Sequence, residues 1–359
     1  MGWNSWNAFR CDIDGEQIRE VTDALVESSM REAGYEFVTL DDCWMAHERT
    51  DEDELVGNPE RFPRGMAALG DYVHERGFAY GIYQSAGTFT CAHRYDDYPT
   101  SGSLTHEQAD AETFADWGVD FLKYDNCGDH LDFDARERYR RMWDALDATG
   151  RSVVKSQCSW GEYEEWEWAR EVGAHTWRTT TDIHDTWDSV LAILDQQVGL
   201  AEHAGPGGWN DPDMLQVGND GLTTSESRAH FSLWCVLAAP LFAGNDVREM
   251  DAATRDILTN EAAIAVNQDP AGVQGTRRKR DGDGEVWAKP LADGDVAVCL
   301  LNRGESTREV ELGVDQLALP DAAAYECRDL WTDEAFAVED VVGATVPGHD
   351  VAFYRVGAA

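Results

Sequence analysis

The sequence predicts a (β/α)8 barrel over residues 1–272, followed by a small antiparallel β-sandwich over residues 273–359. Up to Pro270, amphipathic helical stretches alternate with short apolar strands, the pattern of a parallel sheet with crossover helices. Beyond that point the sequence changes to short alternating runs separated by turn residues, which is typical of antiparallel strands. The length of 359 residues suits one large domain and a smaller second one.

Five stretches have the apolar spacing of helices, and each ends at a glycine, which readily adopts the positive φ found after a helix. The first begins at Asp14 with Gln17 three residues later, and the third begins at Thr105 with Gln108 in the same place, so both starts resemble a capping box. We expect the helices to end at residues 34, 77, 118, 150 and 173, with Met66 in the second helix and Tyr139 in the fourth.

Eight apolar runs are strand candidates in the same part of the chain, at residues 3–7, 35–40, 78–83, 119–124, 152–156, 175–178, 209–213 and 239–243. Eight strand–helix units match a (β/α)8 barrel, which typically has about 250 residues. A doubly wound sheet is the alternative, but no glycine-rich phosphate loop follows the first strand. The basic patch at residues 276–279 is either a linker or an early strand of the sandwich.

The chain is strongly acidic, with 69 Asp and Glu against 29 Lys and Arg and a formal net charge of −40. This charge argues against nucleic-acid binding, which needs Lys and Arg to neutralise phosphates, and against binding to anionic membrane surfaces. The longest nearly apolar stretch, residues 233–244, contains Pro240 and is shorter than the roughly 20 residues of a spanning helix.

Lysine is scarce, with only four residues in the chain. An acidic surface of this kind repels itself in dilute buffer, and concentrated salt screens that repulsion. We therefore expect a salt-adapted protein, and a generally acidic protein from an ordinary host is the alternative.

The first residues, Met-Gly-Trp-Asn-Ser-Trp, contain neither a basic nor an apolar signal segment. We therefore expect a cytoplasmic protein, or a secreted one whose leader has been trimmed. The eight cysteines are dispersed, with no C-x-x-C pair and no zinc spacing. Cys235 lies in an apolar run, which predicts a buried free thiol.

Carboxylates and aromatic residues gather at the predicted carboxyl ends of the strands, where barrel enzymes hold their active sites. Carboxylates accept hydrogen bonds from sugar hydroxyls and indole rings stack on sugar C–H faces, so this combination without a metal motif indicates a sugar site. Paired carboxylates hydrolyse glycosidic bonds. The residues at these ends include Asp41, Asp42, Trp44, Lys123, Asp125, Ser159, Trp160, Arg178, Asp182, Asp211 and Asp213.

Each of these residues also has a structural interpretation. Asp211 is best read as a helix cap or a solvated turn residue, and Asp182 serves equally well as a cap for the amphipathic run that begins at Ile183. Lys123 and Asp125 share one strand face, and a lysine beside an aspartate on so apolar a strand favours function over a structural ion pair.

Six motifs occur in order: Met1-Gly-Trp-Asn-Ser-Trp6, Leu40-Asp-Asp-Cys-Trp44, Leu122-Lys-Tyr-Asp-Asn-Cys127, Trp177-Arg-Thr-Thr-Thr-Asp182, Gly207-Gly-Trp-Asn-Asp-Pro-Asp-Met214 and Ala239-Pro-Leu-Phe242. Together they resemble glycoside hydrolase family 27, which holds the α-galactosidases (melibiases) and the α-N-acetylgalactosaminidases. The resemblance covers the whole chain. It implies a retaining α-galactosidase, without metal or cofactor, that acts on oligosaccharides of the melibiose or raffinose type with a terminal α-galactose.

The resemblance also implies a role for each site residue. Asp125 matches the nucleophile and Asp182 the general acid/base. Asp41 and Asp42 would accept hydrogen bonds from the 4- and 6-hydroxyls, and Lys123 would reach the 3- and 4-hydroxyls.

The resemblance implies that the remaining site residues surround the sugar. Arg178 would reach the 2-hydroxyl and Asp213 would lie near the floor of the pocket. The walls would be formed by Trp6, Tyr83 and Trp160, although Tyr83 and the tryptophans are equally compatible with core positions.

Family precedent pairs Cys11 with Cys43 and Cys91 with Cys127, and leaves Cys158 free because its usual partner is missing. One departure concerns Ser159, where many family members carry glutamate. Serine at this place is found in the α-N-acetylgalactosaminidases, but the following Trp160-Gly-Glu is closer to plant and microbial galactosidases. The alternatives are therefore α-N-acetylgalactosaminidase or another α-glycosidase of the family and, from a different class, a non-catalytic sugar-binding protein. The sequence leaves open whether the chain forms a homo-oligomer.

Overall fold

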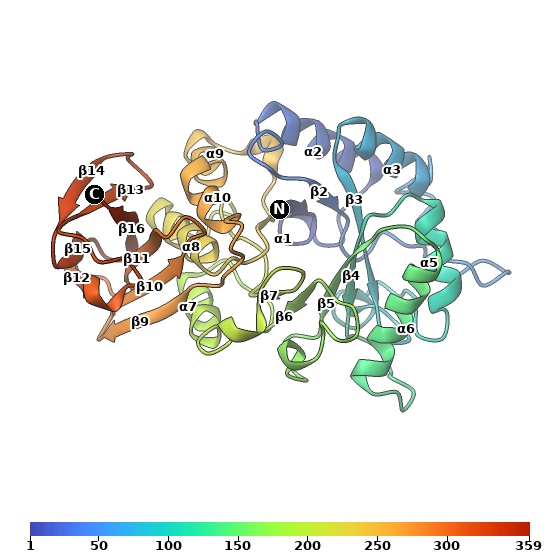
Figure 1. Ribbon diagram of the computed structural model, residues 1–359. Helices are drawn as coiled ribbons and strands as arrows, with labels where there is room; N and C mark the ends of the chain where they lie inside the picture. The colour runs from blue at the N-terminus through green and yellow to red at the C-terminus, as the bar shows by residue number, and fades with distance from the viewer. The chain divides into compact units, whose positions relative to one another are not determined.

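The computed structural model describes residues 1–359 (Figure 1). The chain divides into two compact units, which are described separately below. Unit 1 contains Met1–Thr181 and Phe242–Met250, and unit 2 contains Asp182–Leu241 and Asp251–Ala359.

Unit 1 is built on a parallel sheet whose strands run in the order β6-β5-β4-β3-β2-β1-β8. The ends of three neighbouring strands are in register, because Asp125 pairs with Ser85 on one side and with Cys158 on the other. Side chains at these ends are therefore brought to one edge of the sheet. The strands are β1 (Gly2–Asn4), β2 (Phe37–Thr39), β3 (Ala79–Ser85), β4 (Phe121–Asp125), β5 (Val154–Cys158), β6 (Thr176–Arg178) and β8 (Phe242–Ala243).

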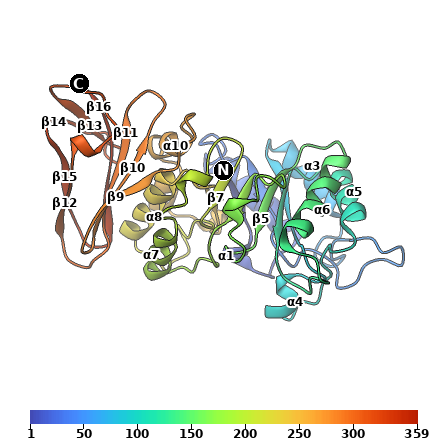
Figure 2. The same cartoon turned by 60° about the horizontal axis from the view of Figure 1, so that its bottom comes forward.

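The helices of unit 1 follow the strands much as the apolar spacing predicts, and Figure 2 shows α5 and α6 side by side. Asp14 caps α2, since its carboxylate accepts hydrogen bonds from the backbone N–H groups of Glu16 and Gln17. The short elements α1 and α4 lie in the loops after β1 and β3. The bounds are α1 (Trp6–Phe9), α2 (Gly15–Glu27), α3 (Met66–Glu75), α4 (Cys91–Tyr95), α5 (Glu107–Asp116), α6 (Ala135–Ala148), η1 (Glu165–Glu167) and η3 (Val247–Glu249).

Three helix boundaries differ from the sequence prediction. The first helix ends at Glu27 instead of Gly34, because Ser29 adopts a left-handed φ of 65°. The third begins at Glu107, since Thr105 has a φ of 75° and so lacks the extended backbone of a capping residue. The stretch expected to form a helix up to Gly173 contains only the 3₁₀ turn η1.

Unit 2 combines barrel elements with the antiparallel strands. Its two sheets have the orders β14-β13-β16-β11-β10-β9 and β12-β15, and they enclose an apolar core that includes Val298, Leu300, Leu312 and Val342. The basic patch at residues 276–279 is an early strand, not a linker. The sheet strands are β9 (Thr276–Asp281), β10 (Gly284–Pro290), β11 (Val296–Asn302), β12 (Arg308–Gly313), β13 (Tyr325–Asp329), β14 (Ala335–Val338), β15 (Val341–Val346) and β16 (Asp350–Ala358).

The remaining elements of unit 2 belong to the last part of the barrel. Helix α8 packs against β10, β11 and β16, which is why it falls in one compact unit with the sandwich. The predicted boundary between residues 272 and 273 stays a prediction. The elements are α7 (Trp187–Gln196), η2 (Ala201–His203), β7 (Trp209–Asp211), α8 (Thr224–Val236), α9 (Ala252–Leu258) and α10 (Glu261–Asn267), whereas the 3₁₀ turn η4 (Val314–Gln316) lies between β12 and β13 of the sandwich.

The predicted fold class is confirmed: eight parallel strands, β1 to β8, alternate with helices and are followed by an antiparallel β-sandwich. None of the helices combines the length and the apolar character that a membrane span requires. Both disulfides implied by the resemblance are present, Cys11–Cys43 and Cys91–Cys127. Cys158 and Cys235 are buried free thiols, as expected.

Candidate active site

A buried ion pair joins two strand ends in unit 1. Lys123, on β4, lies 2.8 Å from the Oδ2 atom of Asp41, which follows β2, and the two side chains are 15% and 3% exposed. The same oxygen accepts a hydrogen bond from Nδ2 of Asn4 at 2.7 Å. A carboxylate this deeply buried is tolerated because a cation and a donor compensate its lost hydration. The arrangement fixes the direction in which Asp41 and Lys123 present their remaining hydrogen-bonding capacity.

Asp42 is held by the backbone and is only 1% exposed. Its Oδ1 accepts the N–H of Cys43 at 2.7 Å and its Oδ2 accepts the N–H of Ala92 at 2.8 Å. Burial, and to a smaller extent the adjacent charge of Asp41, raises the pKa of Asp42 to about 7, although the two backbone hydrogen bonds act in the opposite direction. This carboxyl group therefore titrates in the neutral range.

Asp125 ends strand β4 and is oriented by a tyrosine. Tyr83, on β3, donates its hydroxyl hydrogen to Oδ2 of Asp125 at 2.9 Å, and the N–H of Asn126 is donated to Oδ1 at 2.9 Å. Burial, reinforced by the charge of Asp125, raises the pKa of Tyr83 well above its usual value, so the phenol keeps its proton and remains a donor. Cys91, within its disulfide, places Sγ 3.1 Å from the same Oδ2. The two donors, the phenol of Tyr83 and the N–H of Asn126, orient the carboxyl group of Asp125 at the strand end, as a nucleophile requires.

Lys123 and Asp125 lie along the same face of β4, as their spacing predicts, and Tyr83 contacts both. The Nζ atom of Lys123 lies 5.6 Å from the centre of the Tyr83 ring. Lys123 forms an ion pair with Asp41, and the hydroxyl of Tyr83 contacts Asp125. One aromatic side chain therefore connects the hydroxyl-binding group with the predicted nucleophile.

Strand β5 ends in a buried polar network. Ser159 is fully buried, and its Oγ accepts a hydrogen bond from Nε2 of Gln157 at 3.3 Å. Both carboxylate oxygens of Glu165 are buried without a hydrogen-bond partner, and burial raises the pKa of this group, an effect that the nearby hydroxyl of Ser159 partly offsets. Arg178 is 3% exposed and donates Nη2–H to the carbonyl oxygen of Thr180 at 3.1 Å. The hydroxyl of Ser159 is thus held by the side chain of Gln157.

Asp213 organises the loop next to Asp182 in unit 2. The Oδ2 atom of Asp213 accepts the N–H of Ile183 at 2.8 Å, and its carbonyl oxygen accepts the indole N–H of Trp234 at 2.8 Å. Asp182 itself is exposed, and it is not a helix cap, because α7 is capped by Thr186. The structural interpretation of Asp182 is therefore excluded, and its catalytic role stays a prediction.

Non-glycine residues with left-handed backbone occur at three of these positions. Cys43, Trp160 and Asp213 have φ values of 71°, 58° and 82°. Such conformations cost free energy and persist where surrounding contacts enforce them, commonly at functional sites. Here they turn the chain directly after Asp42 and Ser159, and at Asp213 itself.

Sequence reasoning missed two residues of this site. The position of Asn4 could have indicated a site residue only weakly: it is a polar residue at the end of β1, as Asp125 is at the end of β4. Glu165 gave none, because it lies in a loop whose path cannot be read from periodicity. No group of three or more His, Cys, Asp or Glu side chains in the chain is arranged to hold a metal ion.

Comparison with known proteins identifies the family. A family profile described as alpha galactosidase A matches residues 1–269, and one described as the alpha galactosidase C-terminal beta sandwich domain matches residues 281–356. The chain belongs to the α-galactosidase A family, glycoside hydrolase family 27. It is therefore a glycoside hydrolase.

Curated relatives in this family cover nearly the whole chain. An alpha-galactosidase of Cyamopsis tetragonoloba is 46% identical over 99% of this chain and 85% of that protein, and one of Coffea arabica is 48% identical over 99% and 92%. Among solved structures, alpha-galactosidase I from Mortierella vinacea is 34% identical, with a TM-score of 0.95 over 100% of this chain and 96% of that one. The family membership agrees with the resemblance shown by the six motifs.

Proposed function

We propose that the chain is a retaining α-galactosidase that hydrolyses terminal α-galactosyl residues of oligosaccharides. The observation that carries the proposal is the strand-end arrangement in unit 1, where Asp125 is oriented by Tyr83 and Asp41 is paired with Lys123. Relatives named alpha-galactosidase at 46% and 48% identity support the same substrate class.

The chemistry proceeds in two displacements. A carboxylate oxygen of Asp125 attacks the anomeric carbon, the bond to the leaving-group oxygen breaks, and Asp182 gives its proton to that oxygen. Water then attacks the anomeric carbon, Asp182 takes a proton from it, and the bond to Asp125 breaks. Two inversions leave the product with the configuration of the substrate.

Galactose recognition rests on the two adjacent carboxylates, Asp41 and Asp42, with Lys123. Vicinal carboxylates accept hydrogen bonds from hydroxyls on neighbouring carbons, which suits an axial 4-hydroxyl. A site built to bind one hydroxyl rejects an analogue without that hydrogen bond by up to about 10⁴–10⁵-fold. α-Glucosides should therefore be very poor substrates.

The second candidate is α-N-acetylgalactosaminidase, which the small side chain of Ser159 favours. We place it second because the relatives named above carry the name alpha-galactosidase. Hydrolysis of p-nitrophenyl α-galactoside, its N-acetylgalactosaminide and its α-glucoside should be compared by kcat/KM. A higher value on the N-acetyl substrate would overturn the galactosidase assignment, and binding without turnover on all three would favour a sugar-binding protein.

The cytoplasmic location stays a prediction. The two disulfides favour its alternative, export to an oxidising compartment, because cytosolic thiols are kept reduced. Fractionation of the host cells followed by immunoblotting separates the two locations. Gel filtration with light scattering decides whether the chain forms a homo-oligomer.

A further inference from the structure

Unit 1 contains an open cavity, one of whose lining residues, Tyr163, contacts Asn126 after the end of β4. It lies at the N-terminal end of α6 and the loop that follows β5, with a volume of about 330 Å³. The lining side chains that matter here are Asp134, Arg136, Tyr163, Glu164, Glu167 and Trp168. The same loop carries Trp160, which is expected to form a wall of the galactose pocket.

The cavity presents one aromatic ring. Tyr163 is 39% exposed, in a chain that buries most of its aromatic side chains. The indole N–H of Trp168 is donated to the carbonyl oxygen of Tyr163 at 2.9 Å, and the guanidinium of Arg136 lies 5.4 Å from the Trp168 ring centre. Trp168 is 4% exposed, so its ring offers no free face to a ligand. Tyr163 is thus the aromatic face available to a ligand.

Tyr163 is also connected to the predicted nucleophile. Its hydroxyl oxygen lies 3.4 Å from Nδ2 of Asn126, the residue that follows Asp125. The same amide contacts Oε2 of Glu162 at 3.2 Å, and its Oδ1 accepts a hydrogen bond from the buried Arg138 at 2.9 Å. A side chain that lines the cavity therefore contacts the residue that follows Asp125.

The charges of the cavity select the kind of ligand. Three carboxylates, Asp134, Glu164 and Glu167, line it together with a single guanidinium, that of Arg136. Excess negative charge disfavours phosphate, sulfate or uronic acid groups, whereas carboxylates accept hydrogen bonds from neutral hydroxyls. An exposed aromatic ring with carboxylate acceptors suits an uncharged sugar.

We propose that this cavity binds the sugar units on the leaving-group side of the scissile bond, with Tyr163 as the stacking surface. The proposal rests on the proposed α-galactosidase function and extends it to the recognition of longer oligosaccharides. The residues that accept the additional hydroxyls are Glu164 and Glu167.

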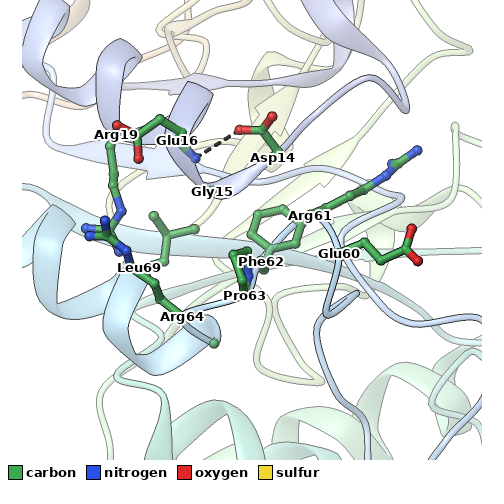
Figure 3. A pocket seen from close by; sticks show the side chains of 11 residues that line it. Asp14, Gly15, Glu16, Arg19, Glu60, Arg61, Phe62, Pro63, Arg64 and Leu69 are labelled. Atoms are coloured by element: carbon green, nitrogen blue, oxygen red, sulfur yellow. Dashed lines mark hydrogen bonds between the residues drawn. The ribbon is translucent and has the colours of Figure 1, made fainter.

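A second cavity of unit 1 lacks these properties (Figure 3). It has a volume of about 280 Å³ and lies near the start of α2. Its three arginines are balanced by three carboxylates, so it has no excess of negative charge. Its one aromatic residue, Phe62, is 4% exposed and offers no free face for stacking.

The test compares raffinose, a trisaccharide, with α-galactosyl fluoride, whose leaving group contains no sugar. We expect Tyr163→Ala to lower the ratio of kcat/KM for raffinose to that for the fluoride by about five- to tenfold, since one aromatic contact contributes about that factor. Tyr163→Phe keeps the ring and should retain most of the raffinose activity. The control is Phe336→Ala on β14, because Phe336 has the same 39% exposure outside this cavity.

The outcomes separate the two proposals. If the wild-type protein hydrolyses neither substrate, the proposed function is wrong. If it hydrolyses both and Tyr163→Ala leaves the ratio of the two kcat/KM values unchanged, the subsite is wrong. An equal loss of raffinose activity in Tyr163→Phe and Tyr163→Ala would also overturn stacking, because it would assign the effect to the hydroxyl contact with Asn126.

Discussion

Two groups of carboxylates in this molecule, one in each unit, have their charge balanced differently. In unit 2, Asp195 on α7 and the fully buried Glu285 on β10 contact three guanidiniums, those of Arg277, Arg280 and Arg303. Burial alone would raise the pKa of Asp195, but the hydrogen bonds and charges of these arginines together hold it below its usual value. The cations exceed the carboxylates, so this cluster is satisfied without any ligand.

The strand ends of unit 1 show the opposite balance. Asp41 and Asp42 follow β2, Asp125 ends β4, and the cation among these three carboxylates is Lys123, which forms an ion pair with Asp41. The pKa of Asp42 rises to about 7 as a result of burial and of the nearby Asp41. Where buried carboxylates outnumber the cations beside them, hydrogen-bond donors of a ligand can compensate the remaining charge. Here the proposed donors are sugar hydroxyls. The difference separates a structural cluster from a functional one, and the experiments below test it.

The largest effect is expected from Asp125→Asn. Removing the nucleophile should lower kcat by about 10⁴-fold or more while galactose still binds, because the amide keeps the shape of the side chain. Turnover and isothermal titration with galactose are the measurements. Asp120→Asn is the matched control, since Asp120 precedes the same strand and forms ion pairs with Arg151 and His74. Comparable loss of turnover in both variants would contradict the assignment.

The next prediction compares the loss of one cation in each region, Lys123 in unit 1 and Arg303 in unit 2. Lys123→Met should lower kcat/KM by about 10²–10³-fold, since it leaves Asp41 buried without its partner cation. Arg303→Met should instead lower the free energy of unfolding by about 1.5–3 kcal/mol and leave kcat/KM unchanged, because hydrogen bonds to Asp195 and Glu285 are lost while Arg277 and Arg280 still balance the charge. Urea titration and initial rates give both quantities. Loss of activity in folded Arg303→Met would remove the distinction between the two regions.

The pH dependence of substrate binding follows from Asp42. Its raised pKa means that the carboxylate is ionised only above about pH 7, so KM for a galactoside should rise as the pH falls from 8 to 5. In Asp42→Asn, kcat/KM at pH 8 should fall by about 10- to 100-fold, and the pH dependence of KM should flatten. An unchanged pH profile in the variant would show that another group titrates in this range.

The smallest effect concerns salt. The net charge of −40 repels itself at the surface, and the Debye length falls from about 10 Å at 0.1 M to about 3 Å at 1 M. The thermal midpoint should therefore climb by about 5 °C or more over this range, while the difference between wild type and Arg303→Met changes little because that cluster is partly buried. A flat midpoint would show that the acidic composition is not an adaptation to salt.

The sequence predicted those features that depend on local order. The apolar strands and the residues at their ends could be predicted from the sequence. The apolar periodicity, the glycines that end the helices and the motifs all agree around Asp41, Asp125 and Arg178. The cap of α7 could not be chosen, because both Asp182 and Thr186 are chemically suitable and only the backbone path decides.

Contacts between residues far apart in the sequence could not be predicted. The hydrogen bond from Asn4 to Asp41 joins residues from two strand ends, and the sequence around either residue does not indicate its partner. Glu165 becomes buried beside Ser159 only through a loop with left-handed residues at Trp160 and Glu164. The balance of charge that distinguishes the two carboxylate clusters is likewise a property of the folded chain.

The central claim, that Asp125 forms a covalent intermediate in a retaining hydrolysis, is tested most directly by the configuration of the first product. Proton NMR during the first turnovers of p-nitrophenyl α-galactoside records which anomer of galactose accumulates before mutarotation. The account predicts α-galactose first, followed by slow conversion to the equilibrium mixture. Accumulation of β-galactose first would contradict it.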